Sequence, residues 1–234
     1  MSNDVDFSAL DEALKSVDGV IDKINAEKQA EEASRAVEDC RFRAVGERSA
    51  ARAFFTSLAL ALVPQVAGDD ETETAATDGK RLLFNPEWVL GLEPEERYGV
   101  MIGHEPMHCA MEHFARFRGM DDLSTANEAG DLEINPICRE AGFTLPDEAI
   151  FPGEGDYQHC LPGKTLEEYY GLLQKKKPEE KQGGGDEPGD KGGQDPGGCG
   201  GVIPAPDQAA AEHQANTWKG RVAAAAQAAA QRGD

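Results

Sequence analysis

The pattern HEPMH at residues 104–108 is the part of the sequence best suited to chemistry. Four residues advance a helix by about 400°, so His104 and His108 leave the same face and can bind one zinc ion. Glu105 stands beside them, where its carboxylate can take a proton from a zinc-activated water and pass it to a leaving amine. The spacing therefore predicts a catalytic zinc site that hydrolyses peptide bonds with Glu105 as general base.

A catalytic zinc needs a third protein ligand, and the next expected helix offers two acidic candidates. Asn127, Asp131 and Asn135 recur every four residues and form a polar stripe on a helix whose other positions include Ala129, Leu132, Ile134 and Ile137. Glu128 lies in the range at which a following helix supplies a glutamate ligand, but Thr125 and Glu128 have the spacing of a capping box, which would commit that carboxylate to a backbone amide. We prefer Asp131 as the third ligand and keep Glu128 as the alternative.

Two further residues bear on this geometry. Pro106 lacks a backbone donor and crowds the carbonyl of Ile102, so the helix is expected to kink, with the histidines either still converging or displaced and inactive. His113 follows His104 by nine residues, which places it on the opposite side of an unbroken helix. We interpret His113 as a packing or capping residue unless the helix breaks after Cys109.

Composition excludes several classes of partner. The chain has 44 acidic and 23 basic residues and a formal charge of −21, which opposes binding to nucleic acid or to an anionic membrane surface. No apolar run reaches the roughly 18 residues of a membrane span, and the first residues are acidic, unlike a signal peptide. Five scattered cysteines without a CxxC pair predict reduced thiols. We expect a cytoplasmic protein.

The composition divides the 234 residues into four segments. Residues 1–40 place apolar side chains at helical spacings among charges, which predicts an acidic amphipathic helix. Residues 41–175 carry the HEPMH pattern and form the catalytic domain. Residues 176–206 are rich in glycine and proline, which predicts a disordered linker. Residues 207–234 are rich in alanine and predict a helix that needs a partner to be stable.

The catalytic domain is expected to be mainly helical with one small sheet. Residues 41–66 indicate a first core helix, and Arg81–Phe84 indicates a short strand whose nearby partner is residues 74–77, so a hairpin or small sheet is expected. Helix starts are predicted at Pro94, at Ser124 or Thr125, and at Thr165.

Five motifs in this domain resemble a known bacterial and phage family, the "putative metallopeptidase domain" that commonly precedes a von Willebrand factor A-like domain. They are TAATDGKRLLFNPEWV at 74–89, GHEPMHCAMEH at 103–113, NEAGDLEIN at 127–135, the AGFTLPDEAIF that follows, and KTLEEYYGLL near 164. The resemblance implies an α+β, mainly helical, zincin-like fold, with His104, His108 and Asp131 as zinc ligands and Glu105 as general base. It also implies an edge strand that aligns the substrate, for which Arg81–Phe84 is the candidate.

Two departures from the family are Pro106 within the signature and the lack of the A-like domain in this sequence. We therefore expect a zinc metallopeptidase acting on a protein or peptide, and a separate von Willebrand factor A-like or ATPase protein is a candidate partner. The alternative is a catalytically inactive, metal-binding adaptor that recruits proteins through its helical tails.

Overall fold

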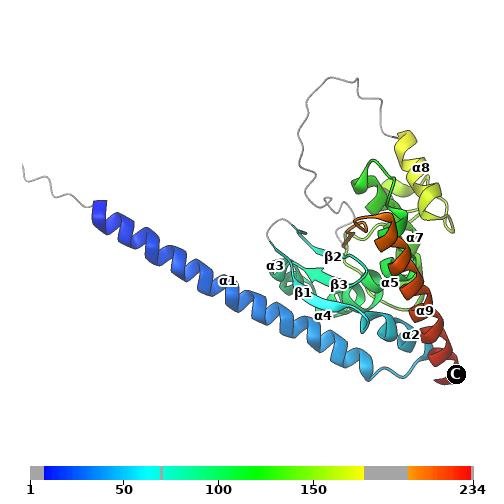
Figure 1. The fold of residues 1–234 in the computed structure, drawn as a ribbon, viewed down its shortest axis with the longest axis horizontal. Helices are drawn as coiled ribbons and strands as arrows, with labels where there is room; N and C mark the ends of the chain where they lie inside the picture. Colours follow the sequence, from blue (N-terminus) through cyan, green and yellow to red (C-terminus); the bar gives the residue numbers. More distant parts are fainter. Residues whose placement is uncertain (1–7, 69–70, 177–199, 233–234) are drawn as a thin grey trace, which may run out of the picture.

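The computed structural model describes residues 8–68, 71–176 and 200–232. Within them, helices pack around one small sheet, so the α+β, mainly helical class is confirmed (Figure 1). No helix among the described residues combines the length and apolar character that crossing a bilayer requires. Cys40, Cys109, Cys138 and Cys160 are buried free thiols, as the sequence predicts.

The sheet has four strands in the order β1-β3-β2-β4. Strand β2 (Ala75–Thr77) pairs antiparallel with β3 (Arg81–Phe84), which confirms the predicted hairpin. Strand β1 (Val63–Val66) pairs parallel with β3, and β4 (Gly201–Val202) pairs parallel with β2. The prediction that β3 is an edge strand is wrong, because β1 and β2 cover both of its sides.

Residues 41–66 do not form the single helix that was expected. Helix α1 (Ser8–Val45) ends before a turn, Ser49 caps α2 (Ala50–Ala59) by accepting from the Arg52 N–H, and the chain then enters β1. The apolar pattern concealed β1 because its four residues follow α2 closely and include Pro64. Proline is tolerated there because β1 is an edge strand.

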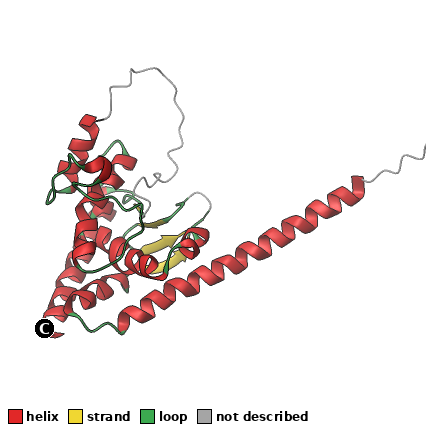
Figure 2. Ribbon diagram, turned by 180° about the vertical axis from the view of Figure 1, so that it is seen from behind, coloured by secondary structure: helices red, strands yellow, loops and turns green. Residues whose placement is uncertain are grey.

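Helix α1 has two different halves. Its last turns bury Ala33, Val37, Cys40 and Ala44 in the common core. Residues 15–28 are exposed, and the helix projects away from the body of the molecule (Figures 1 and 2). The body therefore holds α1 by one end only.

The remaining helices surround the sheet and the HEPMH segment. They are α3 (Pro86–Gly91), α4 (Pro94–Tyr98), the π-helix η1 (Gly99–His104), α5 (Glu105–Ala110), α6 (His113–Arg116), α7 (Leu123–Glu140), the 3-10 helix η2 (Gly155–Tyr157), α8 (Leu166–Lys176) and α9 (Gln208–Arg232). Helix α8 begins where it was predicted, with a capping box: the Thr165 N–H donates to the Glu168 carboxylate, and the Glu168 N–H donates to the Thr165 hydroxyl.

The partner of the alanine-rich helix α9 is the core of its own chain. It packs along α2 and also contacts α5 and α6. Trp218 is fully buried, and its indole N–H donates to the Gly79 carbonyl at 2.8 Å. The Gln214 amide donates to the Asp78 carbonyl at 3.1 Å, so α9 holds the turn between β2 and β3.

The linker predicted for residues 176–206 differs from the structure at both described ends. Lys176 is the last residue of α8, and residues 200–206 include strand β4. Glycine and proline content alone does not reveal that Gly201 and Val202 lie in a sheet, because their pairing partner β2 is more than a hundred residues earlier in the sequence. The rest of the predicted linker, residues 177–199, lies outside the described residues.

Candidate metal centre

The HEPMH segment lies at the junction of η1 and α5. The Glu105 N–H donates to the Val100 carbonyl, a π-helical bond that widens the helix directly before Pro106. Such a widening is a common way to absorb a residue that cannot fit a regular α-helical turn. The expected kink does not separate the histidines, because the Nε2 atoms of His104 and His108 lie 3.0 Å apart.

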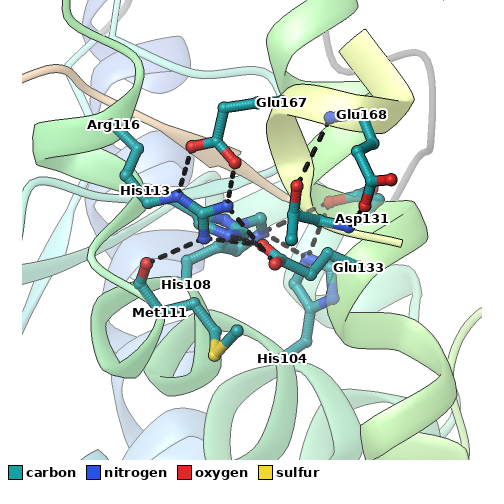
Figure 3. A network of polar contacts seen from close by, with 10 residues as sticks. His104, His108, Met111, His113, Arg116, Asp131, Glu133, Glu167 and Glu168 are labelled. Carbon is teal, nitrogen blue, oxygen red and sulfur yellow. Dashed lines mark hydrogen bonds and ion pairs between the residues drawn. The ribbon is translucent and has the colours of Figure 1, made fainter. Parts of the chain in front are cut away.

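Asp131 of α7 completes a compact buried group with these two histidines. Its Oδ1 lies 3.6 Å from His104 Nε2 and 3.2 Å from His108 Nε2. One ligand atom from each of the three residues falls within 4.8 Å of the others. The three side chains come from η1, α5 and α7, and all face a common point (Figure 3).

Glu128, the alternative third ligand, is not part of this group. Its carboxylate accepts a hydrogen bond from the Tyr157 hydroxyl at 2.8 Å. The capping box predicted for Thr125 and Glu128 is also wrong, because α7 begins three residues earlier than Thr125 would require. Asp122 is the N-cap instead, accepting from the Thr125 N–H at 3.0 Å.

The group has the properties of an acceptor set for a divalent cation. Neither carboxylate oxygen of Asp131 accepts a hydrogen bond among the described residues, although the side chain is only 1% exposed. Burial raises the pKa of Asp131 to about 7, against the attraction of His104. A buried carboxylate without donors is costly unless a cation compensates it, so these residues fit a metal ion.

The histidines are held in the form that binds metals. Burial lowers the pKa of His104 to about 4 and that of His108 well below its usual value, so both imidazoles are neutral near pH 7. Their Nε2 atoms face Asp131, which leaves the Nδ1 atoms for hydrogen bonds that fix the tautomer.

Asn135 fixes the tautomer of His104. Its amide nitrogen donates to the Ile150 carbonyl at 2.9 Å, so its Oδ1 is the atom left to accept from His104 Nδ1, 2.8 Å away. The proton of His104 therefore lies on Nδ1, and the lone pair of Nε2 points at the centre of the group.

His113 performs the same role for His108, because the helix breaks after Cys109, which is the condition under which the packing or capping interpretation does not apply. The helix breaks at Glu112, whose left-handed conformation (φ 60°) redirects the chain into α6. His113 Nδ1 then lies 2.7 Å from His108 Nδ1, and its Nε2 lies 2.8 Å from Glu133 Oε2. The Glu133 carboxylate accepts a hydrogen bond from the His113 Nε2–H, so His113 Nδ1 is free of a proton and accepts from the His108 Nδ1–H.

Charges behind His113 hold this chain of hydrogen bonds in place. Burial opposes ionisation of Glu133, but hydrogen bonds from His113 and Arg116 keep its pKa below the usual value. Arg116 also pairs with Glu167 of α8 at 2.7 Å, which links three helices around His108 (Figure 3). Gly130 leaves room for His113, since a Cβ there would lie 2.9 Å from His113 Nδ1.

Glu105 is fully buried next to the histidines, and the backbone of Gly200 lies against its carboxylate. Sequence reasoning named Glu105 but missed Gly200, Glu133 and the role of His113. The sequence feature that could have pointed to Glu133 is its position as a second acid in the helix that carries Asp131. No sequence feature distinguishes Gly200, because glycine is common in residues 183–201.

Comparison with protein families agrees with this geometry. Residues 37–234 match the model of a family described as "Putative metallopeptidase domain". Because the match covers most of the chain, the chain belongs to this family. No curated protein and no solved structure matches this chain.

Proposed function

We propose that this member of the metallopeptidase-domain family is a zinc-dependent endopeptidase, with His104, His108 and Asp131 as zinc ligands and Glu105 as general base. The observation that carries the proposal is the buried Asp131 carboxylate, which has no hydrogen-bond donor among the described residues and faces two neutral imidazoles. When bound, zinc acidifies water and polarises the scissile carbonyl.

The other steps of the proposed reaction depend on residues of the chain itself. Glu105 accepts a proton at its carboxylate and returns it to the leaving nitrogen of the peptide bond. Asn135 and His113 keep protons on the Nδ1 atoms of His104 and His108, so that both Nε2 lone pairs remain available. Their burial and hydrogen bonds keep these groups in fixed positions during the reaction. The four buried free thiols support a cytoplasmic location.

The test compares bound zinc and cleavage of β-casein, an unstructured protein, in wild type, Glu105→Gln and His104→Ala. Glu105→Gln is expected to keep zinc but lose cleavage by about 10²–10⁴-fold, because only the proton transfer is removed. His104→Ala is expected to lose both.

The third ligand is tested by the pair Asp131→Ala and Glu128→Ala. Only Asp131→Ala is expected to lower zinc affinity strongly. Glu128→Ala removes an acid of the same helix that hydrogen-bonds to Tyr157 instead, so it serves as the matched control. A strong loss of zinc in Glu128→Ala alone would reject the proposed ligand set.

A metal-stabilised adaptor is the second candidate, favoured by the exposed Val17, Val20, Ile21 and Ile24 on the projecting half of α1. A separate von Willebrand factor A-like or ATPase partner would contact this arm, since α9 is already packed on its own chain. Zinc retained without cleavage in wild type, and in the variants described below that open the site, would favour the adaptor.

A further inference from the structure

Residues 200–205, here called the crossing segment, run past the candidate metal centre in extended form. Gly201 and Val202 pair with Ala76 and Thr77 of β2 in parallel register, and the Ile203 N–H donates to the Thr77 carbonyl at 2.9 Å. Residues 200–202 are buried. The segment therefore occupies the edge of the sheet next to the HEPMH segment.

The crossing segment touches the proposed general base. A Cβ at Gly200 would overlap Glu105 Oε1 and would lie 3.5 Å from His104 Cδ2. The φ of Gly200, +154°, is also one that residues with a side chain rarely adopt. Only glycine fits where the segment meets Glu105.

The other side of the crossing segment is held by the helix that carries Asp131. Asn127 Oδ1 accepts from the Val202 N–H at 3.0 Å. Asn127 precedes Asp131 by one turn of α7, so the side chain that grips the segment and the side chain that faces the histidines share one helix face. Between β2 and Asn127, the extended backbone is held through its own N–H groups, and the Val202 side chain packs in the core.

The crossing segment is held more firmly at its other end, at Ala205. The Ala205 N–H donates to the Phe114 carbonyl at 2.8 Å, and Arg118 donates to the Ala205 carbonyl at 2.7 Å. By contrast, the crossing segment begins with Gly200 and Gly201, which have no side chains to contribute apolar contact, and β4 is only two residues long. The part of the segment beside Glu105 is thus the part most easily displaced.

An exposed strand edge beside a hydrolytic site is where an extended polypeptide binds by strand addition. We propose that the crossing segment is a built-in pseudosubstrate: it fills the peptide-binding edge formed by β2 and Asn127, and an unstructured polypeptide with glycine opposite Glu105 replaces it. This inference rests on the proposed function for its consequence, because displacement then switches peptidase activity on.

Two variants open the edge in different ways. Val202→Pro removes the N–H that donates to Asn127, but keeps the Ile203 N–H that pairs with β2 and does not substitute the glycine beside Glu105. Gly200→Ala introduces the overlapping Cβ directly. Gly163→Ala is the matched control, because Gly163 also has a positive φ (+80°) but has nothing within 4 Å of an added Cβ.

The first measurement is hydrogen exchange of residues 200–206 in the full chain, with bound zinc measured in parallel. The second is the affinity of Glu105→Gln protein for fluorescein-labelled β-casein by anisotropy, with and without Val202→Pro. We expect faster exchange at 200–206, unchanged zinc and about tenfold tighter casein binding in Val202→Pro, with no change in Gly163→Ala. A tenfold change corresponds to the loss of about one hydrogen bond to the competing segment.

Several results would overturn the inference. One is exposure of residues 200–206 with no gain in casein binding. Another is unaltered exchange in both Val202→Pro and Gly200→Ala, or loss of the folded state in both, which would make the segment a permanent strand of the sheet. Casein binding is measured without turnover, so a gain in binding with no cleavage by Val202→Pro would reject the peptidase, while the crossing segment would still be shown to occupy a polypeptide-binding edge.

Discussion

At the scale of single residues, the site depends on which nitrogen of each imidazole carries the proton. Asn135 and His113 settle this for His104 and His108 through hydrogen bonds of 2.8 and 2.7 Å. Such partners contribute to metal affinity without touching the metal.

Replacing Asn135 with leucine is therefore expected to weaken zinc binding by about 10–100-fold. The variant removes the acceptor for His104 Nδ1 while keeping similar volume. Zinc affinity is measured by competition with a chromogenic chelator. Asn216→Leu, on the exposed face of α9, is the control, and equal zinc affinity in both variants would contradict the role of Asn135.

The residues that approach the proposed metal could be predicted because they depend on helical periodicity alone. His104 and His108 are one turn apart, and the Asn127, Asp131 and Asn135 stripe places its acid on the facing helix. The role of His113 could not be predicted in this way. It depends on a helix break at Glu112, a residue with no intrinsic preference for the left-handed conformation. The partner of Asn127, Val202, is 75 positions away, and no local pattern joins them.

At the scale of elements, the break between α5 and α6 carries strain. The left-handed conformation of Glu112 costs a residue with a side chain about 1–2 kcal/mol. Its carboxylate forms an ion pair with the largely exposed Lys219 at 3.6 Å. Pairs of this kind contribute little.

Glu112→Gly is expected to raise the free energy of unfolding by up to about 1 kcal/mol, after the larger unfolded-state entropy of glycine is allowed for. Urea unfolding measures the change. Glu112→Ala keeps the strain and should not stabilise. A gain of equal size in both variants would mean that the conformation is not the cause.

The hairpin turn offers a test by pH. Burial alone would raise the pKa of Asp78, but the backbone N–H groups of Arg81 and Lys80 and the Arg81 guanidinium hold it below its usual value. A carboxyl whose pKa is lower in the folded state stabilises the fold above its unfolded pKa of about 3.9, and this contribution is lost as pH falls through the folded value.

Asp78→Asn should therefore lower the free energy of unfolding by about 1–2 kcal/mol at pH 7, and by progressively less below about pH 4. Urea titrations across this range measure the difference. The exposed Asp147→Asn provides the baseline. A deficit that stays constant down to pH 2 would show that the charge of Asp78 does not stabilise the turn.

The elements that could be predicted are those with local signals. The closeness of residues 74–77 to Arg81–Phe84 indicated the β2–β3 hairpin, and the start predicted at Thr165 agrees with that of α8. Strands β1 and β4 had no such signal, because each is short and pairs with a strand set by tertiary packing. The edge of the sheet was consequently assigned to the wrong strand.

At the scale of the whole molecule, stability is concentrated at the packing of α9 on the core. Trp218 is fully buried and bonds to the β2–β3 turn. Trp218→Ala is expected to lower the free energy of unfolding by about 3–5 kcal/mol, measured by urea unfolding. Trp88→Ala, which removes a partly buried tryptophan from α3, should be milder. The reverse order would contradict this view of α9.

The projecting half of α1 should contribute almost nothing to the stability of the fold. Residues 15–28 are exposed, so deleting residues 1–28 is expected to change the free energy of unfolding by less than about 0.5 kcal/mol. Deletion through Val45 also removes Ala33, Val37 and Cys40 from the core and should unfold the protein. Thermal unfolding of both truncations measures the contrast, and a large loss in the shorter one would contradict it.

The length of α1 affects how the molecular mass of the protein is measured in solution. Its 38 residues extend over about 57 Å, and much of that rod stands clear of the body. A single copy therefore has a larger hydrodynamic radius than a sphere of equal mass. It elutes early from a size-exclusion column, at a volume that resembles that of a dimer. Light scattering, which reports mass independently of shape, is the measurement that separates one copy from two.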